Sequence, residues 1–374
     1  MGDHGLWEKT LEVLKKIGAR PSASAKEKEL LSFVRDTLQN LGMMVEWDDF
    51  PAPSTYTWGH LLLWVGLAQA GLLVVVVPLW SVLSSLFFLL AEYLELATFP
   101  VLSSLFCFHR SANVIGKYSH IPEFVLMAHV DSARPSIFFH PRFATNPRFS
   151  LLLLVYSSLF ITGSSIFAMF WSREVLFWVA FFPSLYLIFL ALGHLHREFW
   201  MVPSPGGNDN GSGVAVVLEL AKRLKERGVP FWVVFTGAEE SGTWGALHLL
   251  QKYGPLLKGK PVLNIDSVGI GALTVATREG MWKLYQATPG LVAGFQSLQE
   301  SVLHFRPYLG LSTDATPLLA RGFEALTIIA LGENGLPVHW HWGTDTVGAL
   351  ERNNLVQVVQ IVTRWVEERY GHAS

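Results

Sequence analysis

Charged residues are scarce in this sequence. Asp, Glu, Lys and Arg make up 16% of the 374 residues, whereas hydrophobic residues make up 51%. A soluble globular domain usually carries about 25% charged residues, so part of this chain is expected to face a lipid bilayer. The formal net charge is −2, which excludes the strongly basic composition of a nucleic-acid-binding domain, and no nucleic-acid partner is predicted.

Cysteine is almost absent as well. The chain has one, Cys107, which excludes an intramolecular disulfide and fits a reducing compartment. The first sixteen residues, MGDHGLWEKTLEVLKK, are charged and helix-like. They lack the apolar core of a signal peptide, so none is predicted there.

Three stretches without any charged residue are long enough to cross a bilayer, which takes about 20 apolar residues. These stretches are residues 59–91, 150–171 and 175–193. The last two are separated by only three residues and are interpreted as a helical hairpin. The first contains Pro78 near its middle and is interpreted as another hairpin, although buried helices or helices in the membrane interface would have a similar composition. The sequence thus predicts an integral membrane protein with four helices, in insertions at 59–106 and 150–193.

Two acidic residues follow the first charge-free stretch. Glu92 and Glu95 would lie in or near the second limb of the first hairpin. Inside the bilayer they would be functional candidates, whereas at the interface they would simply be solvated. Both alternatives stay open at this point.

Basic residues orient the predicted protein. Twelve of them precede the first hairpin or lie between the two hairpins: Lys9, Lys15, Lys16, Arg20, Lys26, Lys28, Arg35, Arg110, Lys117, Arg134, Arg142 and Arg148. The opposite side carries only Arg173, which is next to Glu174. Because cytoplasmic loops are enriched in Lys and Arg, the rest of the chain is predicted to lie in the cytoplasm.

Outside the insertions, apolar runs alternate with amphipathic segments. Strands are predicted at 43–49, 112–118, 123–129, 230–236, 261–266, 272–277 and 324–330. Helices are predicted at 6–18, 25–41, 211–227, 242–253, 281–300 and 350–370. This alternation is typical of a mainly parallel sheet covered on both faces. The predicted fold is an α/β, three-layer domain formed by residues 1–58, 107–149 and 194–374.

Acidic residues and histidines cluster where predicted strands end, which is where parallel sheets bind their ligands. The motifs are HVD at 129–131, NDNGSG at 208–213, GAEE at 237–240, NIDS at 264–267 and HWGTDT at 341–346. Each has an ordinary structural alternative, such as a strand-end hydrogen bond, a helix N-cap or a charged first turn of a helix. Together they indicate a two-metal hydrolase.

The chemistry of a two-metal site explains these residue types. His129 is a candidate ligand, with Asp131 as the acceptor for its second ring nitrogen. Asp209 offers two carboxylate oxygens and could bridge two ions. Of Glu239 and Glu240, one could bind a metal while the other acts as a general base. Histidine and carboxylate ligands suit zinc, with cobalt or manganese as substitutes.

The order of the motifs resembles the co-catalytic di-zinc aminopeptidase family, which includes bacterial leucyl aminopeptidases, glutamate carboxypeptidase and glutaminyl cyclases. The resemblance covers residues 111–131 and 201–346. It implies two zinc ions, five ligands and one base: His129 and Asp266 for one ion, Glu240 and His341 for the other, Asp209 between them and Glu239 as the base. The family spacing favours His341 over His339.

The chain also departs from the family pattern. The family usually has Tyr before the last histidine and Thr or Ser after it, but here Trp340 and Trp342 occupy these positions. The usual Ser-Asp-His segment is Thr313, Asp314, Ala315. Trp340 and Asp314 are therefore candidate substrate-binding residues.

The expected function is a membrane-embedded metallo-aminopeptidase. The resemblance implies a peptide substrate with a free N-terminus, and the hairpins favour short or hydrophobic peptides at a bilayer surface. Two alternatives stay open: glutaminyl-cyclase-like or other amide chemistry at a one-zinc site, and a non-catalytic membrane scaffold. The oligomeric state is not predicted.

Overall fold

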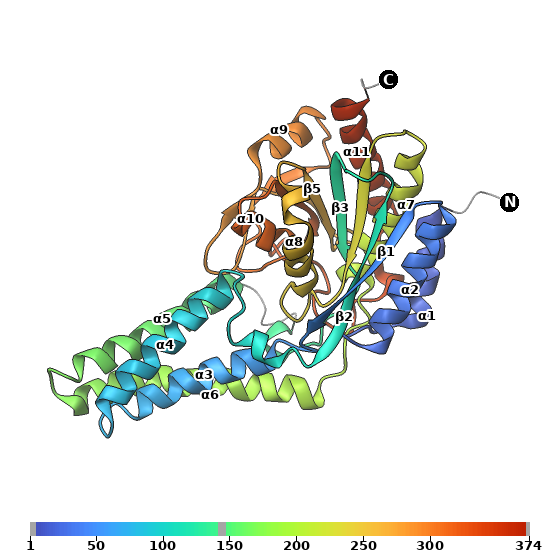
Figure 1. Ribbon diagram of the computed structural model, residues 1–374. Coiled ribbons are helices and arrows are strands. Elements are labelled where there is room, and N and C mark those ends of the chain that lie inside the picture. The colour runs from blue at the N-terminus through green and yellow to red at the C-terminus, as the bar shows by residue number, and fades with distance from the viewer. Residues whose placement is uncertain (1–4, 141–146, 372–374) are drawn as a thin grey trace.

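A computed structural model describes residues 5–140 and 147–371. It shows an α/β domain from which four long helices extend at one end (Figure 1). Arg142, one of the basic residues used to predict orientation, lies outside the described residues.

Eight strands form one mixed sheet in the order β1-β2-β4-β3-β5-β10-β6-β9. They are β1 (Met44–Ala52), β2 (His109–Lys117), β3 (Phe124–His129), β4 (Phe231–Thr236), β5 (Val262–Asp266), β6 (Ala272–Ala276), β9 (His304–Arg306) and β10 (Ala325–Leu331). The four central strands β4, β3, β5 and β10 are mutually parallel and buried at every residue. Burial on both faces explains their continuous apolar sequences and confirms the predicted mainly parallel α/β sheet.

Helices cover both faces of the sheet. One face packs against α1 (Leu6–Ile17), α2 (Ala25–Asn40), α7 (Gly213–Lys225) and α11 (Arg352–Tyr370), which share the largest apolar cluster. The other packs against α8 (Trp244–Leu257) and α10 (Ala315–Ala320), which share a second cluster. The three predicted layers are therefore present.

The segment 281–300 differs from its prediction as one helix. It contains the short strand β8 (Tyr285–Gln286), which pairs with β7 (Arg278–Glu279), before α9 (Pro289–Ser297) begins. Proline is favoured in the first turn of a helix because its missing N–H would have no partner there. Pro289 thus places the start of α9 later than the apolar pattern indicated.

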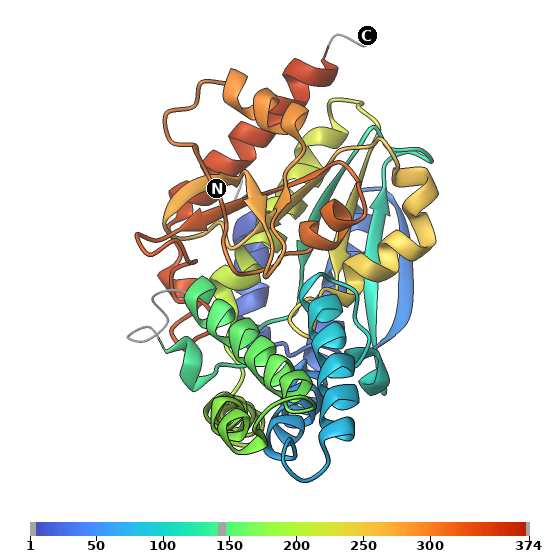
Figure 2. The same cartoon turned by 90° about the vertical axis from the view of Figure 1, so that its left-hand side faces the viewer.

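The two segments predicted as transmembrane hairpins form four helices that pack into a bundle (Figures 1 and 2). They are α3 (Thr57–Leu72), α4 (Pro78–Leu96), α5 (Pro147–Phe167) and α6 (Arg173–Trp200). Helices α4, α5 and α6 are long and apolar enough to cross a membrane, whereas α3 has 16 residues. Large side chains such as Trp80, Trp178 and Phe182 are more than half exposed on the bundle surface.

Helix α4 ends at Leu96, and Glu95 explains why the chain turns there. Its Oε1 accepts hydrogen bonds from the backbone N–H groups of Val101, Leu102 and Ser103, at 2.8, 2.6 and 2.9 Å. A separate 3₁₀ turn, η1 (Ser103–Phe106), follows. The Glu95 carboxylate is therefore hydrogen-bonded within this turn and stabilises it.

The last turn of α6 fixes the bundle to the α/β domain through Arg197, which is 2% exposed. Its guanidinium donates to Thr55 Oγ1 at 2.9 Å, to Thr57 Oγ1 at 3.0 Å and to the Arg134 carbonyl at 3.0 Å. The guanidinium carbon also lies 4.3 Å from the centre of the Tyr56 ring. These contacts connect both hairpins to the chain segment that leaves β3.

Candidate metal centre

The ends of three neighbouring parallel strands meet at one edge of the sheet. His129 is the last residue of β3 and Asp266 the last of β5, and Thr236 at the end of β4 pairs in register with His129. Glu239 and Glu240 follow in the loop after β4. Parallel pairing thus brings together residues that are more than a hundred positions apart in the sequence.

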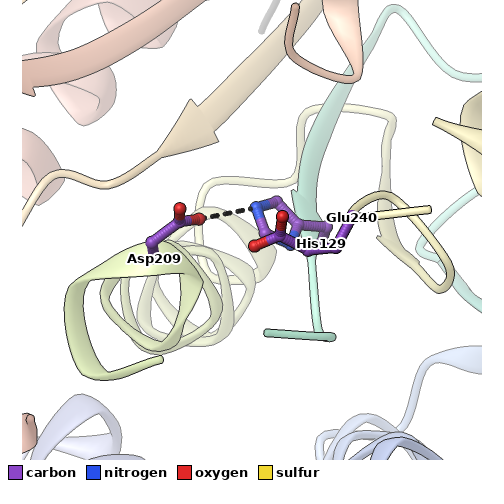
Figure 3. A group of neighbouring side chains, drawn as sticks. All are labelled: His129, Asp209 and Glu240. Atoms are coloured by element: carbon purple, nitrogen blue, oxygen red, sulfur yellow. Dashed lines mark ion pairs between the residues drawn. The ribbon is translucent and has the colours of Figure 1, made fainter. Parts of the chain in front are cut away.

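Two imidazoles face the two oxygens of one carboxylate. His129 Nε2 lies 3.1 Å from Asp209 Oδ1 and 3.7 Å from Asp266 Oδ1. On the other side, His341 Nε2 lies 3.3 Å from Asp209 Oδ2 and 3.1 Å from Glu240 Oε2. The structure therefore forms two histidine–carboxylate groups that share Asp209. Figure 3 shows His129, Asp209 and Glu240 directed toward one another. One ligand atom from each of these three residues lies within 4.8 Å of the other two.

Asp131 organises the loop that carries the two glutamates. Its side chain is fully buried and accepts the backbone N–H groups of Glu239 at 3.1 Å and Glu240 at 3.0 Å. Ser22 donates a third hydrogen bond at 2.6 Å, and His129 Nδ1 lies 3.5 Å away. One carboxylate thus holds the loop and also faces the second nitrogen of the histidine.

Asp345 holds the loop that carries Asp209 by accepting hydrogen bonds from its backbone. The sequence motifs did not predict this role. Asp345 accepts the backbone N–H of Asn208 at 2.5 Å and that of Asp209 at 3.1 Å. The Asn210 side chain connects this loop to β5, donating to the Ile265 carbonyl at 2.9 Å. The peptide bond between Asp209 and Asn210 is cis. Asp345 lies within the HWGTDT motif, so its place in that motif was the signal that could have identified it.

Electrostatics in the cluster follow from burial and close opposite charges. Burial opposes a charge on the two imidazoles, but nearby carboxylates outweigh it: the pKa of His129 lies well above its ordinary value, and that of His341 rises to about 9. Burial alone would raise the pKa of Asp209, yet hydrogen bonds from both histidines lower it. Burial raises the pKa of Glu240. The carboxylates thus need positive partners to stay charged.

Glu239 and Asp314 both interact electrostatically with His129. Burial, opposed by His129 and aided by Glu240 and Asp314, raises the pKa of Glu239 well above its ordinary value. Asp314 is fully buried, accepts a hydrogen bond from Thr236 and has its pKa raised to about 7 by burial. Asp314, predicted as a substrate contact, therefore contacts the end of β4 in this structure.

Aromatic rings surround His341. Trp340 stacks on its imidazole with ring centres 4.0 Å apart, and Phe139 lies 4.7 Å from Trp340 and 5.3 Å from His341. The competing candidate, His339, instead places Nδ1 2.8 Å from Thr344 Oγ1. Phe139 was missed because its segment has no motif or periodicity.

Comparison with known proteins relates this chain to the zinc aminopeptidases. Residues 187–366 match the model of Peptidase family M28. Aminopeptidase YwaD of Bacillus subtilis is 29% identical over 182 residues, which are 44% of this chain and 38% of that protein. An aminopeptidase of Pseudomonas aeruginosa is 43% identical over 82 residues, 20% of this chain and 14% of that protein. The chain thus matches well under half the length of these relatives.

Solved structures share the fold over nearly the whole chain. A zinc aminopeptidase from Bacillus subtilis has a TM-score of 0.57 at 18% identity, with 99% of this chain and 96% of that chain covered. A glutaminyl cyclase from Porphyromonas gingivalis has a TM-score of 0.55 at 15% identity, with 98% and 97% covered. The family match and these likenesses confirm the predicted resemblance to the zinc aminopeptidases.

Proposed function

We propose that this chain is a membrane-embedded, zinc-dependent aminopeptidase that hydrolyses the N-terminal peptide bond of short or hydrophobic peptides. The observation that carries the proposal is the placement of Asp209 between two separate imidazoles, 3.1 Å from His129 and 3.3 Å from His341. A carboxylate that faces two histidine–carboxylate groups is the arrangement a pair of divalent ions needs. The family model covers residues 187–366, which include Asp209, Glu240 and His341, and the matched relatives are aminopeptidases.

The residues present fit zinc. Asp209, Glu240 and Asp266 are each at most 9% exposed, and such crowding of buried acids is unfavourable without cations. Glu240 Oε1 and His341 Nδ1 are buried without a hydrogen-bond partner among the described residues. Imidazole and carboxylate donors are the usual zinc ligands, and cobalt or manganese could substitute. Three carboxylates and one hydroxide would balance the charge of two divalent ions.

We assign His129 and Asp266 to one ion, His341 and Glu240 to the other, and Asp209 to both. When bound, the ions would supply Lewis-acid activation of a water molecule and of the substrate carbonyl.

Glu239 is the proposed general base, which accepts a proton from the attacking water and delivers it to the leaving amine. Its backbone is held by Asp131, which also faces the second nitrogen of His129. Such outer partners fix the orientation of a metal-binding histidine. Asp131 therefore aligns the base and a ligand at the same time.

The rings of Trp340 and Phe139 form an aromatic wall beside His341, and this wall favours apolar substrates. Trp340 replaces the tyrosine usual in the family, and with Phe139 it presents two rings at the edge of the site. An indole cannot supply the phenol hydroxyl, but it adds apolar area against which a hydrophobic side chain can pack.

The hairpins support a location of the proposed reaction at a membrane. Three helices of the bundle meet the length and composition of membrane spans. We treat 59–106 and 150–193 as membrane insertions into one catalytic domain, and the charge distribution favours the cytoplasmic side for that domain.

The test combines Glu239→Gln with a metal count in the full-length protein in detergent. Two zinc ions per chain are expected to remain, while turnover of aminoacyl and peptide substrates falls about 10²–10⁴-fold. Glu240→Gln is the matched control at the adjacent position, and it should lose metal as well as turnover. Unchanged turnover in Glu239→Gln would refute the assignment of the base.

A second candidate is glutaminyl-cyclase-like chemistry. The likeness to the cyclase from Porphyromonas gingivalis favours it. It predicts one zinc per chain and cyclisation of peptides that begin with glutamine. Two bound zinc ions and release of free amino acids would exclude it, whereas a chain without zinc would indicate a scaffold.

A further inference from the structure

A cavity of about 370 Å³ lies between α4 and α5, away from the metal centre. Six aliphatic side chains from the two helices line it, together with Tyr93 and with Trp282 from the α/β domain. The remaining lining residue is Glu92. In Figure 2 these two helices run beside each other below the domain. Outer lining residues such as Leu90, at 59% exposed, place the cavity at the surface of the bundle.

Glu92 is the unusual member of this lining. The residue is 2% exposed, and neither carboxylate oxygen has a hydrogen-bond partner among the described residues. The hydroxyl of nearby Ser158 donates to the Leu154 carbonyl in its own helix at 3.2 Å. Glu95, one turn away, is by contrast fully hydrogen-bonded. Burying a carboxyl group without a hydrogen-bond partner is costly, and a cationic group in the cavity would supply the missing partner.

We propose that this cavity binds an apolar molecule with a single primary ammonium head, and that Glu92 pairs with that head. The rest of the lining offers aliphatic groups and two aromatic rings, which suits an alkyl chain. A peptide backbone would bury several amide groups there without partners, which is unfavourable. At about 30 Å³ for each water-sized group, the volume suits a chain on the order of ten heavy atoms.

This site is separate from the proposed hydrolysis. None of its lining residues belongs to the metal centre, so binding and peptide cleavage can be measured independently. Since α4 and α5 are candidate membrane spans, a ligand would reach the cavity from the bilayer side. The site is thus one for a membrane-dissolved, single-chain amine.

The test uses the full chain in phosphatidylcholine nanodiscs, whose lipids carry no primary amine. Octylamine, 1-octanol and octanoate are titrated separately, and the midpoint of thermal unfolding gives an apparent Kd for each. Octylamine should stabilise the protein at concentrations where the alcohol and the acid do not. In Glu92→Gln, its apparent Kd should weaken about tenfold or more, because a hydrogen bond to a charged group is lost.

Two further variants keep the test decisive. Leu89→Phe reduces the cavity and keeps the Glu92 carboxylate, and it should also weaken octylamine binding, which covers the case in which Glu92→Gln fails to fold. Glu174→Gln removes an exposed acid at the start of α6 and should leave the Kd unchanged. Equal binding of amine and alcohol, equal binding by Glu92→Gln, or no binding would each overturn the proposal. Peptide hydrolysis by Glu92→Gln should stay at the wild-type level.

Discussion

Replacing Asp131 with asparagine should weaken the folded state and the metal centre together. Its carboxylate accepts three hydrogen bonds, from Ser22, Glu239 and Glu240, and faces His129 Nδ1. An asparagine of the same shape presents one oxygen and one NH₂ group. Whichever way the amide is turned, its NH₂ meets a backbone N–H, so one buried donor loses its acceptor. Ser22 alone can adapt, because a hydroxyl can also accept.

The expected loss of stability follows from the number of hydrogen bonds that Asp131→Asn removes. One charge-assisted hydrogen bond is lost and one buried N–H is left unsatisfied, which together cost about 2–4 kcal/mol. Loss of an outer partner of a metal-binding histidine typically weakens metal affinity about 10–100-fold. Asp131→Asn should therefore lower the free energy of unfolding and raise the zinc Kd in the same protein.

Denaturant unfolding and zinc competition with a chromogenic chelator measure the two quantities. Ser22→Ala is the matched control, because it removes one hydrogen bond from Asp131 and leaves the charge and both loop contacts. It should cost about 1 kcal/mol and leave zinc affinity nearly unchanged. If Asp131→Asn unfolds like the wild type and binds zinc within twofold, then Asp131 does not organise this loop.

Three further predictions concern stability, metal and substrate. Burial opposes the charge on Glu46, but hydrogen bonds from Lys117 and Lys252 lower its pKa to about 2 from an ordinary 4.5. Its contribution, about 1 kcal/mol after solvent screening, should be present above pH 4.5 and lost as pH falls toward 2. Glu46→Gln, unfolded in urea at pH 7 and pH 3, should therefore be destabilised more at pH 7 than at pH 3, where only part of the contribution remains. Thermal unfolding should be measured with free zinc at a thousand times its Kd and again after a chelator has removed the zinc. The free energy of unfolding should be about 4 kcal/mol lower without zinc. Phe139→Ala should raise KM for peptides with an apolar first residue about tenfold, with partial recovery in Phe139→Leu, and equal KM values would show that Phe139 does not line the substrate site.

The central strands and the residues at their ends could be predicted because one physical cause produces both. A strand buried on both faces reads as a continuous apolar run, so a polar residue at its end, such as His129 or Asp266, stands out. Because ligand sites lie where parallel strands end, the sequence alone predicts that these two residues lie close together.

The supporting network could not be predicted in the same way. Asp345 holds a loop that is 136 residues away in the sequence, and no local pattern records that distance. The short strands β7, β8 and β9 have two or three residues, too few to show alternation. Phe139 lies in a turn whose sequence has no period at all.

The turn that contains Phe139 also shows how an inserted bundle and a metal site can share one scaffold. Phe138 packs against α6, with ring centres 5.5 Å from Phe189 and 6.1 Å from His194. The next residue, Phe139, contacts the ring of His341. Adjacent side chains therefore connect a candidate membrane helix to a candidate metal ligand. Because packed interiors transmit displacements, a shift of α6 would move this aromatic wall as well. The bundle is thus part of the support of the site, in addition to any role as a membrane anchor.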